Sequence, residues 1–396
     1  MKIVKNKKAI ITICVVAFCC IYGALLAYAY FTGAYEIVAP QSTANTGATN
    51  TQTQATTALP DISLPDCDNG THVFGDDDLC IACKSLARSF FYFEELYDGT
   101  SAIYAKPNVV FPKEFKIAAN YSGRIVARIQ DEGFSTSVNE SMKNVEKIIL
   151  PETLTIIYSE SFRNCESLKE INLPEGLTEL GEDCFRYCVS LEEIVIPQNV
   201  RIIGKNAFSA CSALKKIEFI QRNTDDVMCL INTGAFRNCE ALESIELPSF
   251  AVINGESVFS GCKSLKRAVM ENTGAGLPKC TFYNCQSLET VELKNFKGSI
   301  GMSAFYHCQN LKTFVIPNGV ETIEESAFGS CSSLETLYIP KTVSKIEEDL
   351  LDSCTNFETI YYSGTLEEWG NIEKAEFHGS FLIRCTVICT DGEIWA

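Results

Sequence analysis

The sequence predicts a solenoid of stacked short coils, and three observations lead to this fold class. A cysteine recurs nine times, at intervals of 23 residues with a single interval of 28. Each of these cysteines has an aromatic or apolar residue three positions before it and another three positions after it. An apolar-x-apolar pair then follows, as expected of a short strand with one buried face. One such unit has nothing to bury its apolar side chains against, so neighbouring units must stack.

Residues 1–35 predict on which side of a membrane the protein lies. Lysines from Lys2 to Lys8 precede an uncharged apolar stretch, Ala9–Tyr30. About 20 apolar residues span a bilayer, and a basic flank stays on the cytoplasmic side. A cleaved signal peptide explains the same pattern, because Ala27-Tyr28-Ala29 is a suitable cleavage site. Both interpretations place the rest of the chain outside the membrane, either at the cell surface behind a single-pass anchor or secreted.

Residues 36–64 predict a flexible stalk, because the stretch Gln41–Ala58 is rich in Thr, Asn and Gln and carries no charge. Residues 65–108 form a small Cys/His segment, in which we expect Ser85–Gly99 to be a helix that packs on the first coil.

The Cys/His segment contains one candidate metal site. Cys67, His72, Cys80 and Cys83 supply four ligands, which is the number that a closed, structural zinc site requires. A disulfide with one spare thiol, or no bond at all, explains the same residues. We expect no other cofactor, and no catalytic zinc, since the set implies no open coordination position.

Residues 145–362 form the repeat array. Within one coil we expect a strand at Ile194–Ile196, a break at Pro197, a second apolar pair at Val200 and Ile203, and a single helical turn around the cysteine. The cysteines are Cys165, Cys188, Cys211, Cys239, Cys262, Cys285, Cys308, Cys331 and Cys354. They follow Phe162, Phe185, Phe208, Phe236, Phe259, Phe282, Phe305, Phe328 and Leu351, and precede Leu168, Leu191, Leu214, Leu242, Leu265, Leu288, Leu311, Leu334 and Phe357.

The repeat unit LPEGLTELGEDCFRYCVSLEEIVIP resembles the leucine-rich repeats of the BspA-like family of bacterial and protist surface proteins. The resemblance covers about Val109 to the C-terminus. Residues 109–144 are similar to the first capping coil of such arrays, and residues 363–396 to their usual cap. In that cap Trp369 would cover the last coil and Cys385–Thr390 would add a strand. The resemblance implies a right-handed β/α solenoid, placement on the cell surface, adhesion or protein binding, and no catalysis.

The ladder cysteines have two interpretations. Nine thiols in an oxidising compartment suggest disulfides. Each cysteine nevertheless holds an equivalent inward position, and free cysteine behaves as a small buried hydrophobe. Parallel side-chain vectors on neighbouring coils also make the disulfide torsion unfavourable. We therefore expect buried free thiols.

The residues that flank the inward pair of each strand form two columns on the expected concave face. They are Glu170, Glu193, Lys216, Ser244, Arg267, Thr290, Thr313, Thr336 and Thr359 in one column, and Asn172, Val195, Glu218, Glu246, Val269, Glu292, Val315, Tyr338 and Tyr361 in the other. The C-terminal residues Thr313, Val315, Thr336, Tyr338, Thr359 and Tyr361 are candidate partner-binding residues, because exposed apolar and Tyr side chains form contact hot spots. Thr, Val and Tyr are also good strand formers, which explains them without a ligand. The irregular coil at Ile220–Asn232 is a second candidate surface.

Composition and missing motifs narrow the function. The net charge of -17 excludes nucleic acid and anionic lipid as partners, so the membrane is contacted only through the N-terminal segment. Three histidines, and no GxSxG, HExxH or phosphate-loop motif, argue against an enzyme. The sequence thus predicts a surface protein that binds a protein or a surface glycan. The alternative is a structural or self-associating component of the cell envelope.

Overall fold

The computed structural model describes residues 79–80, 82–221, 227–271, 276–375 and 385–395. The predicted leader and stalk, together with Cys67 and His72, lie outside these residues. Within the described residues no helix has the length and apolar character needed to cross a bilayer.

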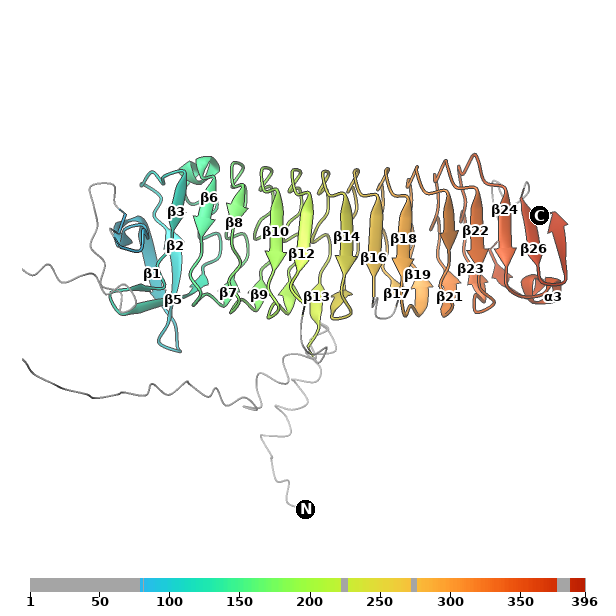
Figure 1. The fold of residues 1–396 in the computed structure, drawn as a ribbon, viewed down its shortest axis with the longest axis horizontal. Coiled ribbons are helices and arrows are strands. Elements are labelled where there is room, and N and C mark those ends of the chain that lie inside the picture. Colours follow the sequence, from blue (N-terminus) through green and yellow to red (C-terminus); the bar gives the residue numbers. More distant parts are fainter. Residues whose placement is uncertain (1–78, 81, 222–226, 272–275, 376–384, 396) are drawn as a thin grey trace, which may run out of the picture. The chain divides into compact units, whose positions relative to one another are not determined.

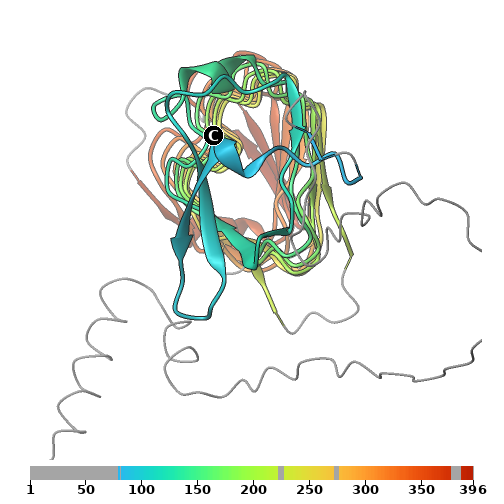
Figure 2. The same cartoon turned by 90° about the vertical axis from the view of Figure 1, so that its left-hand side faces the viewer.

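The described chain is a β-solenoid of stacked coils (Figure 1). Each coil contributes one strand to each of two rows of parallel strands, here called row A and row B. Viewed along the stack, successive coils superpose (Figure 2). The sequence prediction of a solenoid is confirmed.

In most coils of the repeat array, row A contains the strand that follows the buried Leu. Its strands are β3 (Glu114–Lys116), β6 (Lys147–Ile149), β8 (Glu170–Ile171), β10 (Glu193–Ile196), β12 (Lys216–Phe219), β14 (Ser244–Leu247), β16 (Arg267–Met270), β18 (Thr290–Leu293), β20 (Thr313–Val315), β22 (Thr336–Ile339), β24 (Thr359–Tyr362) and β26 (Thr386–Cys389). Hydrogen bonds divide this row into four sheets, of which β20-β22-β24-β26 with its hairpin partner β27 (Gly392–Trp395) has the most strands.

Row B contains the strand of the second apolar pair. Its strands are β2 (Ser101–Ala105), β5 (Arg124–Ile129), β7 (Ile156–Ile157), β9 (Glu179–Leu180), β11 (Ile202–Ile203), β13 (Cys229–Ile231), β15 (Ala251–Ile253), β17 (Gly276–Leu277), β19 (Gly298–Ile300), β21 (Val320–Ile323), β23 (Lys345–Ile346) and β25 (Glu373–Lys374). The short β4 (Asn120–Tyr121) pairs with β5 at the N-terminal end.

The turn that joins row B back to row A is not helical, so the predicted helical turn, and with it the β/α form of the coil, is wrong. Two residues in each turn have positive φ, which L-residues adopt singly and never as a helix. The first set has φ between 52° and 64° and comprises Glu160, Asp183, Asn206, Gly234, Ser257, Cys280, Ser303, Ser326 and Asp349. The second has φ between 57° and 77° and comprises Asn164, Tyr187, Ala210, Asn238, Gly261, Asn284, His307, Ser330 and Ser353.

This geometry aims backbone N–H groups at the next coil. The N–H groups of Asp183, Phe185 and Tyr187 donate to carbonyl oxygens 22 residues ahead, at 2.7–3.0 Å. The turns therefore form a third ladder of hydrogen bonds between coils, and no helix is needed to satisfy their backbone.

The interior is a continuous stack. The rings of Phe134, Phe162, Phe185, Phe208, Phe236, Phe259, Phe282, Phe305 and Phe328 lie 5.0–5.8 Å apart from one coil to the next and within 17° of parallel. These side chains are fully buried. The repeat period thus places one large apolar group in each coil against the same group of its neighbours, which is the burial that a single coil lacks.

The N-terminal end is closed by a hairpin instead of the expected helix. A 3-10 turn, η2 (Arg88–Phe90), leads into β1 (Phe91–Glu95), which pairs antiparallel with β2. The physical reason is that this segment alternates a buried Phe91 with exposed Tyr92 and is rich in aromatic residues, which favour strands. A second 3-10 turn, η3 (Glu140–Asn144), precedes the array.

The C-terminal end agrees with the expected cap. Helix α3 (Leu366–Gly370) begins with a capping box between Thr365 and Glu368. Its Trp369 is 5% exposed and meets the ring of Tyr362 edge-on, with 5.3 Å between centroids. The predicted last strand is β26, and β27 adds an antiparallel strand to it.

Candidate binding surface

The six candidate residues lie together on row A. Thr313, Thr336 and Thr359 pair in register across β20, β22 and β24, as do Val315, Tyr338 and Tyr361. The intervening side chains, such as Leu337 and Ile360, are fully buried. Strand alternation therefore directs the candidates to solvent, as the sequence predicted.

The centre of this surface is a pair of stacked tyrosines. The rings of Tyr338 and Tyr361 lie 4.9 Å apart at 11° to each other, and their exposed fractions are 40% and 39%. Val315, the preceding residue of the column, is 65% exposed. An exposed aromatic pair flanked by an aliphatic side chain is the kind of surface on which interface hot spots form.

The structure adds residues that the sequence did not single out. Thr386 and Ile388 of β26 continue the two columns, in register with Thr359 and Tyr361. Trp395 of β27 lies opposite Thr386 and is 78% exposed. The turn Thr390-Asp391-Gly392 between two short apolar runs is a hairpin signal from which β27 was predictable. We call the residues Val315, Tyr338, Tyr361, Ile388 and Trp395 the aromatic patch.

The N-terminal half of row A is charged, and most of its charges are paired. Lys113 and Lys169 contact the two carboxylate oxygens of Glu146 at 2.7 and 2.8 Å, and they lower the pKa of that carboxyl to about 2. Lys147 pairs with Glu170 on the next coil. Side chains of β6, β8 and the start of β10 line an open hollow of about 800 Å³. Because these cations and anions neutralise each other, a partner that bound this half of row A would gain little electrostatic energy.

One residue that we predicted to be exposed is buried. Val269 has the register of Glu246 and Glu292, yet it is only 1% exposed. The guanidinium of Arg267, two residues earlier, reaches to Glu292 at 3.0 Å on the neighbouring strand. The second candidate surface, Ile220–Asn232, lies partly outside the described residues, and its Val227 and Met228 are exposed.

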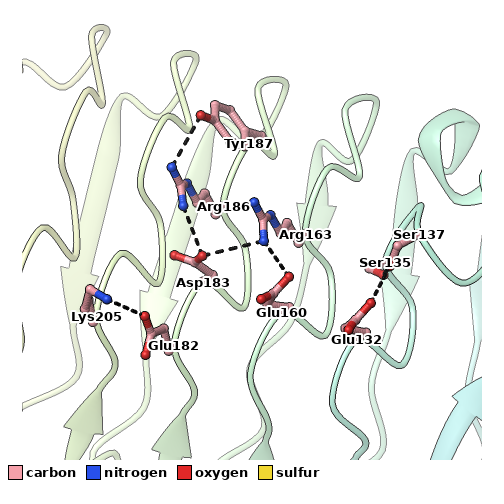
Figure 3. A network of polar contacts seen from close by, with 10 residues as sticks. All are labelled: Glu132, Ser135, Ser137, Glu160, Arg163, Glu182, Asp183, Arg186, Tyr187 and Lys205. Carbon is pink, nitrogen blue, oxygen red and sulfur yellow. Dashed lines mark hydrogen bonds and ion pairs between the residues drawn. The ribbon is translucent and has the colours of Figure 1, made fainter.

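A separate polar cluster lies on the turns (Figure 3). Asp183 accepts a hydrogen bond from Arg186 at 3.1 Å, and the Arg163 guanidinium is 3.8 Å away. Arg163 also pairs with Glu160, and Arg186 contacts the Tyr187 hydroxyl. The cluster joins two neighbouring coils. Each charged group faces an opposite charge, so we interpret the cluster as a structural feature that aligns the two coils.

The ladder thiols are free and buried, as the sequence predicted. Each Sγ donates to the carbonyl oxygen of the Phe in the preceding coil, at 3.0–3.4 Å for the nine cysteines from Cys165 to Cys354. Burial raises the pKa of Cys211 and Cys262 to about 12. A buried thiol that stays protonated is a poor nucleophile, so the ladder does not supply catalytic groups.

Two of the four candidate zinc ligands are described. Cys80 is buried and Cys83 half-buried, in one turn where the Lys84 N–H donates to the Cys80 carbonyl at 2.9 Å. Within the described part of the chain, no three His, Cys, Asp or Glu side chains form a group that could hold a metal ion. Since Cys67 and His72 lie outside that part, the four-ligand set stays a prediction.

The repeat array matches a known family. The model of the BspA type leucine-rich repeat region matches residues 132–266, 229–358 and 275–389, which together cover well over half of the chain. Among curated proteins none matches significantly.

Several solved structures are also similar to this chain. A leucine-rich cell surface protein of Faecalibacterium prausnitzii is 22% identical, with 73% of this chain and 97% of that chain covered and a TM-score of 0.37. A leucine-rich repeat protein of T. pallidum is 22% identical over 58% and 91%, with a TM-score of 0.40. The pneumococcal vaccine antigen PcpA is 16% identical over 81% and 94%, with a TM-score of 0.37. On the family match, the chain belongs to the proteins with BspA type leucine-rich repeats.

Proposed function

We propose that this chain is a non-catalytic recognition protein displayed outside a membrane, which binds a protein or surface glycan through the C-terminal part of row A. The observation that carries the proposal is the stacked, half-exposed pair Tyr338 and Tyr361 beside Val315. Large aromatic groups exposed on a rigid sheet bind with little loss of conformational entropy. The apolar segment Ala9–Tyr30 and the stalk that follows support display outside the membrane.

Three finer expectations are part of this proposal. The solenoid is right-handed, and row A lies on its concave side. Zinc bound by Cys67, His72, Cys80 and Cys83 would stabilise the N-terminal segment, where Tyr121, whose hydroxyl donates to the Leu86 carbonyl, lies close to both described thiols. Metal analysis of the purified chain and of its Cys83→Ser variant tests the zinc: the native chain should retain zinc and the variant should lose it.

The binding test uses a second tyrosine stack as a matched control. Tyr283 and Tyr306 on the turns lie 5.3 Å apart at 7°, and Tyr283 is 38% exposed. The full chain is immobilised and exposed to host-matrix and bacterial-surface extracts, and each retained protein or glycan is quantified. The double change Tyr338→Ala and Tyr361→Ala should remove the retained ligand, whereas Tyr283→Ala and Tyr306→Ala should not. Equal retention by both double variants would remove the proposed face.

The alternative function is self-association in the cell envelope. It is favoured by β27, which among the described strands pairs only with β26, and whose four residues are all exposed and could pair with another strand. Light scattering of the full chain over a range of concentrations separates the two: self-association predicts a mass that rises with concentration, and recognition of another molecule predicts a constant mass.

A further inference from the structure

One position in every coil forms a row of charges beside row A. It is the residue directly after the buried Leu of each coil, or after Val145 in the first of these coils and Phe357 in the last. The row comprises Glu146, Lys169, Glu192, Lys215, Glu243, Lys266, Glu289, Lys312, Glu335 and Glu358. The sign alternates from coil to coil up to Glu335 and then fails, because Glu358 stands where the alternation requires a cation.

The alternation has a physical basis in the stacking. Backbone hydrogen bonds hold neighbouring members of the row together: the Lys215 N–H donates to the Glu192 carbonyl at 2.8 Å, and the Glu358 N–H to the Glu335 carbonyl at 3.0 Å. At such spacing opposite charges attract, and Lys215 does pair with Glu192 at 2.9 Å. Like charges repel at the same spacing.

Glu335 and Glu358 are therefore neighbouring like charges in this row. Both side chains are exposed, and within the described residues neither forms an ion pair. Lys312 precedes Glu335 in the row and carries the opposite charge. Because Thr359 pairs with Thr386, the residue that follows Glu358 in the row is Cys385, so the described members of the row place no cation beside Glu358.

The like-charge pair borders the aromatic patch. In the N-terminal coils, the hollow over row A is lined by this row and by both outward columns, for example by Lys169, Glu170 and Asn172. The same three positions in the last coils hold Glu358, Thr359 and Tyr361. Glu358 directly precedes β24, and Tyr361 follows it three positions later, which corresponds to about 10 Å along an extended chain.

Resting on the proposed recognition role of this face, we propose that its partner is an extended polypeptide segment of another protein, which places a Lys or Arg side chain between Glu335 and Glu358 and an apolar side chain over Tyr338 and Tyr361. The cation would complete the alternation that Glu358 interrupts, and the apolar side chain would cover the exposed rings. Charge complementarity of this kind selects partners more than it adds affinity.

The test uses three synthetic peptides of equal length in which Leu alternates with Lys, Gln or Glu. Their binding to the full chain is measured by fluorescence polarisation at low and at physiological salt. We expect the Leu/Lys peptide to bind, the Leu/Gln peptide to bind more weakly, and the Leu/Glu peptide not to bind. Salt should weaken only the Leu/Lys complex, because it screens exposed charges.

Charge reversal at the pair separates binding from folding. Glu358→Lys should weaken the Leu/Lys peptide about tenfold, since the change replaces an attraction by a repulsion. The same variant should raise the urea midpoint of the array, because it restores the alternation. Glu243→Gln, in the same row but in a distant coil, should leave peptide binding unchanged.

The outcomes distinguish this inference from the proposed function. If all three peptides bind equally and Tyr338→Ala abolishes their binding, the proposed cation of the partner is wrong, but the recognition face is supported. If neither Glu358→Lys nor Tyr338→Ala changes the binding of the Leu/Lys peptide, both the cationic segment and the recognition face are wrong. No peptide binding overturns the extended segment, and a concentration-dependent mass that Glu358→Lys abolishes assigns the site to a second copy of this chain instead.

Discussion

The thiol of Cys188 donates a hydrogen bond to the carbonyl oxygen of Phe162, 26 residues earlier, with 3.2 Å between Sγ and O. That oxygen also accepts the N–H of Cys165 within its own coil, at 3.2 Å. Each ladder cysteine thus fills the interior and supplies a donor to the coil before it. A small apolar residue would fill the interior but could not donate this hydrogen bond. The cysteine therefore joins coils in a way that its hydrophobicity alone does not explain.

Replacing one ladder thiol tests this double role. Cys211→Ala should lower the free energy of unfolding by about 1–2 kcal/mol, through a small cavity and one lost hydrogen bond to the Phe185 carbonyl. Cys280→Ala, at a half-buried turn position, should change it much less. Urea unfolding followed by circular dichroism measures both. Equal losses for the two variants would contradict a specific role for the ladder.

The ladder thiols should resist alkylation while the array is folded. Burial raises the pKa of Cys211 and Cys262 to about 12, so little thiolate exists at neutral pH and reagents are excluded. Iodoacetamide labelling followed by mass spectrometry should modify the half-buried Cys280 before the ladder thiols, which should react only in denaturant. Modification of Cys211 at the rate of Cys280 under native conditions would show that the coils open readily.

The phenylalanine stack should stabilise the array through burial more than through ring contact. Phe236→Leu should cost about 1–2 kcal/mol, because it leaves a gap between Phe208 and Phe259. Tyr283→Leu removes a ring stacked with equal regularity but exposed, and it should cost less than about 0.5 kcal/mol. Comparable losses in thermal unfolding would instead assign the stability to the stacking itself.

Positive φ in the turns predicts where glycine stabilises. Ala210 has φ of 62°, a conformation that costs an L-residue about 1 kcal/mol and glycine almost nothing. Ala210→Gly should therefore raise the urea midpoint. Ala213→Gly, three residues later and outside the positive-φ set, should lower it. A midpoint lowered by both changes would refute the turn geometry.

Acid should remove the stabilising effect of Glu146. Its pKa is lowered from 4.5 to about 2 by hydrogen bonds and ion pairs with Lys113 and Lys169. A group whose pKa falls on folding stabilises the fold above the unfolded value and loses that effect as pH drops towards the folded value. Glu146→Gln should thus be less stable than the native chain at neutral pH, and the difference should shrink from about pH 4.5 downwards. High salt should shrink the difference as well, since both lysine side chains are exposed. A difference that does not change with pH would exclude the ion pairs as its source.

Prediction from the local sequence pattern was wrong for two segments whose secondary structure is decided by tertiary contacts. Ser85–Gly99 has the length of a helix, yet it forms β1 because Phe91 packs into the N-terminal cluster beside Phe111 and Tyr121. The helical turn failed for a similar reason: the N–H of Phe185 finds its acceptor at Ala207 in the next coil, not within its own turn. Propensity acts within a few residues, and these partners lie on neighbouring elements.

The sequence alone establishes the period, the inward residues and the columns of row A, because a repeat puts every equivalent residue into the same surroundings. Tyr338 and Tyr361 could be placed side by side on that basis before any coordinate was known. Tertiary structure decided which carbonyl each thiol meets, that β27 brings Trp395 to the edge of the patch, and that Val269 is covered. These three features depend on the offset between coils and on the path of the chain ends. A sequence period specifies the spacing of residues along the chain but not their direction in space.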